Sequence, residues 1–178
     1  MRRGKLGGEG GSESNPWVTR EEEEATGRVI AAAITVHREL GPGFLESVYH
    51  RALTAELRRR GIEYDSEVDV EVIYRGEVVG RHRLDLLVGR RIVIELKAAQ
   101  ALDAVHFLQL RSYLKATRSP FGLLLNFGNG RLVVKRVVVR PPLLTSRSDL
   151  PSSPTLPRLP PPDGHLGAHS RNADDGEG

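Results

Sequence analysis

Two carboxylates and a lysine lie close together in a strongly apolar part of the chain. Asp85 falls in the apolar run 84–88, and Glu95 and Lys97 fall in the run 92–97. Alternate residues of a β-strand share a face, so Glu95 and Lys97 are expected to point the same way. If the intervening Gly-Arg-Arg forms a three-residue hairpin loop, Asp85 lies opposite Glu95, with Cβ atoms roughly 5 Å apart.

Carboxylates placed in this way repel each other, and a divalent cation would remove the penalty. Oxygen ligands suit Mg²⁺ or Mn²⁺. Lys97 would then orient or polarise a water held by the metal, which lowers the pKa of that water. The alternative is that Asp85 and Glu95 are surface residues on a solvated sheet face and that Lys97 only forms a salt bridge. Their apolar neighbours argue for central, partly buried strands, where unpaired carboxylates are costly.

The elements that position these residues follow from hydrophobic periodicity. A period of 3.6 residues indicates a helix, and a period of two, or a short apolar run between turns, indicates a strand. Helices are expected over 20–40, 44–60 and 103–116, and strands over 67–74, 78–88, 92–97, 121–127 and 132–139. The order α-α-β-β-β-α-β-β predicts an α/β or α+β fold with one mixed central sheet flanked by helices.

The chain has 178 residues, about the length of one domain. The segment 1–15 is rich in Gly, Ser and Glu, and the segment 141–178 is rich in Pro and Ser. Neither can bury enough apolar surface to offset the entropy of ordering it, so both are expected to be disordered. The folded domain is therefore expected over 16–140.

Composition excludes several classes of protein. The chain has no cysteine, which excludes a disulfide framework and metal sites built on thiolates. No apolar run approaches the roughly 18 residues that span a bilayer, and 1–15 has no apolar signal-peptide core. We expect a cytoplasmic protein with no membrane partner. The net charge of +3 permits a phosphate-bearing partner but does not require one.

The pattern from Asp85 to Glu95-Leu96-Lys97 resembles the catalytic signature of the PD-(D/E)XK nuclease superfamily. Further motifs resemble a bacterial family within it that is named for its GxxExxY motif. They are Gly43-Phe44-Leu45-Glu46-Ser47-Val48-Tyr49, Tyr49-His50-Arg51-Ala52-Leu53, the run Gln109 to Thr117, and Gly122-Leu123-Leu124-Leu125-Asn126-Phe127-Gly128. The resemblance covers about 22–140. Leu84 departs from the superfamily name, which has Pro before Asp, at a position that varies in the superfamily.

The resemblance implies a restriction-endonuclease-like α-β-β-β-α-β core with a Mg²⁺ or Mn²⁺ site on the central strands. Asp85 and Glu95 would bind the metal, with the backbone carbonyl of Leu96 as a possible third ligand. Lys97 would position the attacking water. The implied activity is hydrolysis of phosphodiester bonds in nucleic acid, with DNA as the expected substrate.

Two helical residues are implied to support the site. Glu46 would complete the acidic cluster or bind a second metal, and Gln109 matches a Gln common in exonuclease-related branches. Glu46 has an alternative role, because it would be a capping residue at N3 if Gly43 were the N-cap. Tyr49 lies on the inner stripe of its helix and is expected in the core. His106 shares a helix face with Gln109, whereas His82, at odd spacing from Asp85, is expected on the opposite face.

The main alternative is a catalytically silent nuclease fold that binds nucleic acid or a protein partner. A second alternative is an interaction module whose acidic cluster is an ordinary part of its surface. The sequence has no helix-turn-helix, zinc-finger or RRM signature, so contacts with DNA would be made mainly to the backbone and would be sensitive to salt. A small single domain also allows a homodimer or a place in a larger complex.

Overall fold

The computed structural model describes residues 18–139. The expected disordered segments 1–15 and 141–178 lie outside these residues, as do the ends of the expected domain. The described elements are α1 (Arg20–Leu40), α2 (Glu46–Arg59), β1 (Tyr64–Tyr74), β2 (Glu77–Val88), β3 (Ile92–Lys97), α3 (Ala104–Thr117), β4 (Phe121–Asn126) and β5 (Val133–Val138). The element order expected from the sequence is confirmed.

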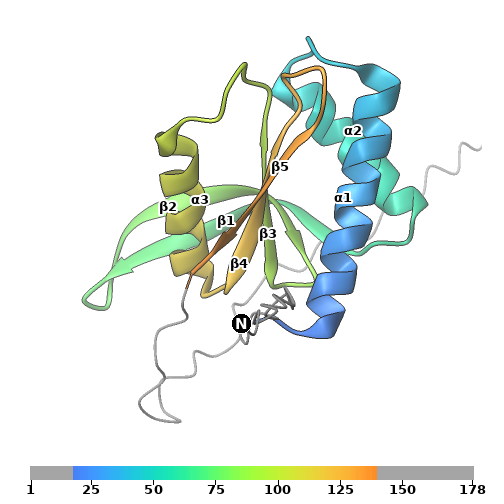
Figure 1. The fold of residues 1–178 in the computed structure, drawn as a ribbon. Helices are drawn as coiled ribbons and strands as arrows, with labels where there is room; N and C mark the ends of the chain where they lie inside the picture. The colour runs from blue at the N-terminus through green and yellow to red at the C-terminus, as the bar shows by residue number, and fades with distance from the viewer. Residues whose placement is uncertain (1–17, 140–178) are drawn as a thin grey trace, which may run out of the picture. The chain divides into compact units, whose positions relative to one another are not determined.

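The five strands form one mixed sheet whose order, β1-β2-β3-β4-β5, is the order of the chain (Figure 1). Strand β2 pairs with β1 and β3 in antiparallel fashion, and β5 pairs with β4 in the same way. Strands β3 and β4 are parallel, and α3 connects them. This arrangement confirms the predicted α+β class with a mixed sheet and flanking helices.

The helices divide between the two faces of the sheet. Helices α1 and α2 cover one face, and α3 covers the other (Figure 1). The first core joins α1 and α2 to the sheet through Val29, Val36, Tyr49, Leu53, Leu86, Ile94, Leu96 and Phe127, among others. The second joins α3 to the sheet through Leu84, Leu87, Val93, Leu110, Tyr113, Leu114 and Leu124, among others. The sheet is thus buried on both sides where β3 and β4 run.

Most element boundaries lie within two residues of their expected positions, and α1 matches exactly. Thr19 Oγ1 accepts the Glu22 N–H at 3.2 Å and Glu22 Oε2 accepts the Thr19 N–H at 2.8 Å, a capping box that fixes the start of α1. Strand β1 is the exception, because it starts at Tyr64, which pairs with Val88. Its first residues do not alternate apolar with polar, so periodicity could not reveal them.

The regular alternation of β2 breaks at Asp85. The β1–β2 register pairs Ser66 with Leu86 and Val68 with Leu84, but it records no pair between Glu67 and Asp85. Glu67 has a φ of 53°, in the left-handed region that non-glycine residues rarely adopt. Leu84 and Leu86 are two residues apart and yet contact different cores. The irregularity therefore frees Asp85 from the regular ladder.

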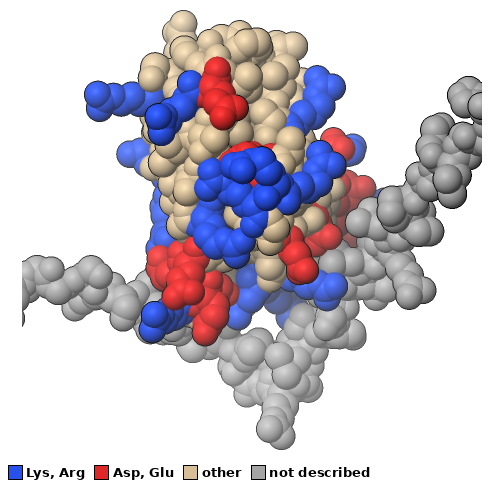
Figure 2. Space-filling model, turned by 90° about the vertical axis from the view of Figure 1, so that its right-hand side faces the viewer, with Lys and Arg blue, Asp and Glu red and all other residues tan. Residues whose placement is uncertain are grey.

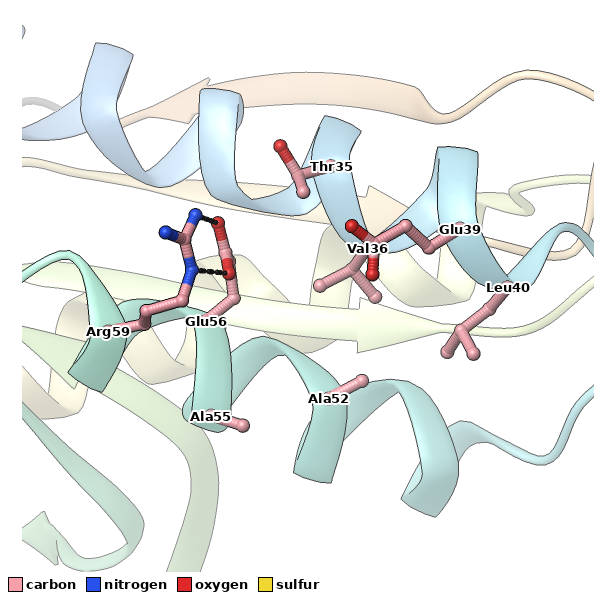
Figure 3. Close-up of a pocket in the computed structure, with 8 residues that line it drawn as sticks. All are labelled: Thr35, Val36, Glu39, Leu40, Ala52, Ala55, Glu56 and Arg59. Atoms are coloured by element: carbon pink, nitrogen blue, oxygen red, sulfur yellow. Dashed lines mark hydrogen bonds and ion pairs between the residues drawn. The ribbon is translucent and has the colours of Figure 1, made fainter.

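A cluster of arginines joins α1 to α2. Figure 2 shows basic side chains gathered on the face that these helices form. Arg28 donates to the Arg60 carbonyl at 3.0 Å, while Arg59 and Arg60 both donate to Glu56 and hold the pKa of that carboxyl near 2. Beside them a pocket of about 270 Å³ opens, lined by Thr35, Val36, Glu39, Leu40, Ala52, Ala55, Glu56 and Arg59 (Figure 3). Its lining includes none of the sequence-predicted site residues.

None of the helices within 18–139 is long and apolar enough to cross a membrane.

Candidate functional site

The hairpin between β2 and β3 brings the predicted carboxylates together. Val88 pairs with Ile92 and Leu86 with Ile94, so three residues form the loop, as expected. Gly89 and Arg90 have φ values of 57° and 61°, the positive values that tight hairpin turns require. Asp85 and Glu95 come directly after the last of these pairs, and they lie close enough for the charge of Asp85 to raise the pKa of Glu95. The carboxyl end of β3 lies at the same end of the sheet as the connection from α1 to α2 (Figure 1).

Asp85 is held through both its side chain and its backbone. The Leu96 N–H donates to Asp85 Oδ2 at 2.7 Å, and His50 Nε2 lies 3.2 Å from the Asp85 carbonyl oxygen. Burial raises the pKa of Asp85, although the Leu96 N–H and the charges of Lys97 and His50 oppose the shift. The carboxyl group is therefore fixed in place but is costly to ionise without a nearby cation.

Glu95 is the most deeply buried member of the pair, with a side chain only 2% exposed. Its Oε1 accepts a hydrogen bond from Lys97 Nζ at 2.7 Å. Its Oε2 is buried and has no hydrogen-bond partner among the described residues. Burial, followed by repulsion from Asp85, raises the pKa of Glu95 to about 7. The two carboxyl groups thus titrate as one interacting pair.

Lys97 supplies the positive charge between the carboxylates. Burial acts to lower its pKa, but the hydrogen bond to Glu95 and the charges of Glu95, Glu46 and Asp85 outweigh burial and raise the pKa. The ammonium group therefore stays protonated at neutral pH. It is positioned by β3 at the point where the strand ends.

Glu46 reaches the same cluster from α2. Its Oε1 lies 3.9 Å from Lys97 Nζ. Burial raises the pKa of Glu46, with Lys97 opposing the shift. The capping alternative is wrong, because the N-cap of α2 is Leu45 and Glu46 is the first helical residue. A carboxylate at N1 also benefits from the positive end of the helix dipole.

The site opens on a groove beside Asp85. This pocket has a volume of about 210 Å³ and is lined by Glu46, Ser47, His50, Glu67, Asp85 and Leu96. Within 18–139, no group of three or more His, Asp or Glu side chains converges as a complete metal site. The buried Glu95 Oε2 has no donor among the described residues, and the carboxyl group lies against that of Asp85. Two adjacent carboxylates form the oxygen donor set that Mg²⁺ prefers. The residues present therefore fit a divalent cation bound partly by non-protein ligands such as water.

Gln109 lies at the border of the site rather than inside it. Its Nε2 donates to the Tyr113 hydroxyl at 2.5 Å, and no hydrogen bond within the described region joins it to a carboxylate. Burial raises the pKa of Tyr113, the Gln109 bond opposes this, and the charges of Glu95 and Asp85 raise it further. Gln109 is thus linked to the pair through Tyr113. His106 accepts the Asp103 N–H at 3.0 Å and caps α3, and its charge acts to lower the pKa of Glu46.

The structure also identifies a neighbour that the sequence analysis did not single out. His50 lies four residues after Glu46 on α2, and its Nε2 contacts both the Asp85 carbonyl oxygen and Ser66 Oγ, the latter at 3.1 Å. The signal for it is the i, i+4 spacing from Glu46, which places both side chains on one side of the helix. Tyr49, expected in the core, is fully buried there.

Comparisons with known proteins bear on the family of this chain. A search of curated proteins gives no match. Among solved structures, the crystal structure of SSO0001 shares 24% sequence identity with this chain, covers 52% of it and has a TM-score of 0.44. The match spans 50% of the SSO0001 chain. The family model of the PD-(D/E)XK nuclease superfamily matches residues 23–137, a range that contains α2, α3, β1 to β4 and the whole Asp85–Glu95–Lys97 cluster. The chain therefore belongs to the PD-(D/E)XK nuclease superfamily.

Proposed function

We propose that this protein is a metal-dependent nuclease that hydrolyses phosphodiester bonds in nucleic acid, with DNA as its substrate. Membership in the superfamily supports nuclease-like chemistry. The observation that carries the proposal is the buried Glu95 beside Asp85. Its Oε1 contacts Lys97 Nζ at 2.7 Å, and its Oε2 has no hydrogen-bond donor within residues 18–139. A structural ion pair would need one carboxylate for one lysine, whereas three carboxylates, those of Glu46, Asp85 and Glu95, act on Lys97.

Asp85 and Glu95 would hold the cation, Mg²⁺ or Mn²⁺, with the carbonyl of Leu96 as a further ligand. When bound, the cation would lower the pKa of water and stabilise the charge that develops on the phosphate. Lys97 would hold the attacking water by a hydrogen bond and oppose the growing negative charge. Glu46, close to the Lys97 ammonium, would keep that group oriented or bind a second cation. Gln109 would support the site through Tyr113.

The finer assignments belong to the same proposal. The motif from Gly43 to Tyr49 supports membership in the GxxExxY family. The expected setting is bacterial and cytoplasmic, and the expected contacts are with the DNA backbone. A homodimer or a larger complex would supply the binding surface that a small domain lacks.

A second candidate is a catalytically silent nuclease fold that binds nucleic acid or a protein partner. The absence of three converging His, Asp or Glu ligands between residues 18 and 139 favours it. In this case Lys97 would serve only to neutralise buried carboxylates. The two functions differ in whether a divalent cation binds and in whether the phosphodiester bond breaks.

The test compares purified wild type with Lys97→Ala, prepared side by side. Both are incubated with supercoiled plasmid, linear duplex, single-stranded DNA and RNA in Mg²⁺, Mn²⁺ or EDTA. Cleavage by the wild type that is lost in EDTA and in the variant would support the nuclease and reveal its substrate. Equal cleavage by both proteins would contradict the role of Lys97. No cleavage by either would favour the silent fold.

A further inference from the structure

The last residue of β4 and the two residues after it contact the chain directly after Lys97. Asn126 is fully buried. Its Oδ1 accepts the N–H groups of Ala99 and Gly128, at 3.0 and 3.1 Å, and its Nδ2 donates to the Ala99 carbonyl at 2.8 Å. A buried amide in a core has a high desolvation cost unless its bonds are made, and here three are made. Two of the three bonds fix Ala99, which lies two residues beyond Lys97.

The next two residues hold the same stretch of backbone from other directions. The Phe127 N–H donates to the Lys97 carbonyl at 2.7 Å. A Cβ atom at position 128 would lie 2.3 Å from the Ala99 carbonyl oxygen, so only glycine allows this close approach. Residues 97–99 are thus held by a side chain, a backbone N–H and a direct backbone contact.

Phe127 also supports the turn that leads to Glu46. Its ring stacks on Tyr49, with centroids 4.7 Å apart and planes 18° apart. The Tyr49 hydroxyl donates to the Gly41 carbonyl at 2.7 Å and accepts the Phe44 N–H at 3.2 Å. These bonds fix the connection between α1 and α2 immediately before Glu46. The backbone of Ala98 in turn hydrogen-bonds to Glu46.

We propose that residues 126–128 act as a brace that sets the distance between Lys97 and Glu46, and that Asn126 is a positioning residue for the reaction. This inference rests on the proposed nuclease function. The brace holds the backbone of Lys97 on one side and, through Phe127 and Tyr49, the start of α2 on the other. A displacement of either group by about 1 Å can cost on the order of 100-fold in rate.

The test is the kinetics of Asn126→Ala on the best substrate of the wild type. We expect kcat to fall about 10-fold to 100-fold with little change in KM, because the brace contacts no substrate. The matched control is Thr26→Val. Thr26 is also fully buried, and its side-chain hydroxyl donates to the Glu22 carbonyl at 2.7 Å, a bond that valine cannot make. Thr26 lies in the first half of α1, away from the brace. All rates are measured well below the melting temperature of each variant.

The control separates positioning from general destabilisation. A kcat that falls in Asn126→Ala but not in Thr26→Val supports the proposal. A kcat in Asn126→Ala equal to that of the wild type overturns it. If Asn126→Ala does not fold, Gly128→Ala decides, because its added Cβ would collide with the backbone of Ala99 and displace it. Wild-type kcat in folded Gly128→Ala then overturns the proposal, and a reduced kcat supports it.

A second readout keeps this inference separate from the proposed function. If the wild type cleaves nothing, the nuclease proposal fails, and the brace is judged by amide hydrogen exchange at Ala98 and Ala99 and by the rise in melting temperature with Mg²⁺. Exchange that becomes more than 10-fold faster in Asn126→Ala, with a smaller Mg²⁺ effect, supports the brace. Unchanged exchange and an unchanged Mg²⁺ effect overturn it.

Discussion

Replacing Glu95 by Gln should change how the stability of the metal-free protein depends on pH. Burial and Asp85 hold the pKa of Glu95 at about 7 in the folded state, against 4.5 for an ordinary glutamate. Between these two values the folded protein keeps a proton that the unfolded chain releases. A glutamine at this position cannot titrate, so Glu95→Gln removes this contribution.

The sign and size of the effect follow from proton linkage. Between pH 4.5 and about 7 the folded state binds one more proton than the unfolded state, so the free energy of unfolding falls as pH rises. The fall is about 1.4 kcal/mol per pH unit, or about 3 kcal/mol over the interval. The stability of Glu95→Gln relative to wild type should therefore rise by this amount between pH 4.5 and 8. In melting temperature this is roughly 10 °C for a domain of this size.

The assay is thermal and urea unfolding in EDTA at several pH values between 4.5 and 8, followed by circular dichroism. Glu24→Gln is the control, because Glu24 is an exposed carboxylate on α1. Addition of Mg²⁺ at pH 8 should stabilise the wild type more than Glu95→Gln, because the cation binds only the folded state and Glu95 is one of its proposed ligands. The same pH slope in wild type and Glu95→Gln would refute the buried-pair interpretation.

Three further predictions concern neighbouring parts of the site. Lys97→Ala should reduce cleavage at least 100-fold, which a plasmid assay measures. The melting temperature of this variant should also depend more on Mg²⁺, because Glu95 loses its ammonium partner; melting curves with and without Mg²⁺ measure this. Tyr49→Phe should lower the free energy of unfolding by about 1–3 kcal/mol, because the Gly41 carbonyl and the Phe44 N–H lose their partner. Urea denaturation measures this change, and a variant as stable as the wild type would contradict the prediction. DNA binding should weaken linearly on a log–log plot against salt, and fluorescence anisotropy that is insensitive to salt would contradict contacts with the backbone.

The sequence was sufficient to place the carboxylate pair. Three residues between two apolar runs fix a hairpin register that pairs Leu86 with Ile94, and Asp85 and Glu95 are the next residues along the two strands. The helix and strand order was also predictable, because each element has a clear period and a turn signal at its ends. These features depend on residues close together in the chain.

Features that depend on distant residues were not predictable. Faces along β2 could not be predicted past Asp85, because the alternation breaks there. The contact of His82 with α3, where its ring lies 4.8 Å from that of Tyr113, has no local signal either. The start of α2 was placed two residues early, so that a capping role for Glu46 was left open. The contact of His50 with Asp85 joins residues 35 positions apart, which no local pattern encodes.

The order of the sheet has a consequence for folding kinetics. Because every strand pairs with its neighbour in the chain, the hairpin that carries Asp85, Glu95 and Lys97 closes through three residues and can form early, before α3 and β4 complete the sheet. The repulsion between the two carboxylates then opposes an early step of folding. Protonation or a divalent cation should accordingly raise the refolding rate, and the brace at 126–128, which needs β4, forms afterwards around a hairpin already in place.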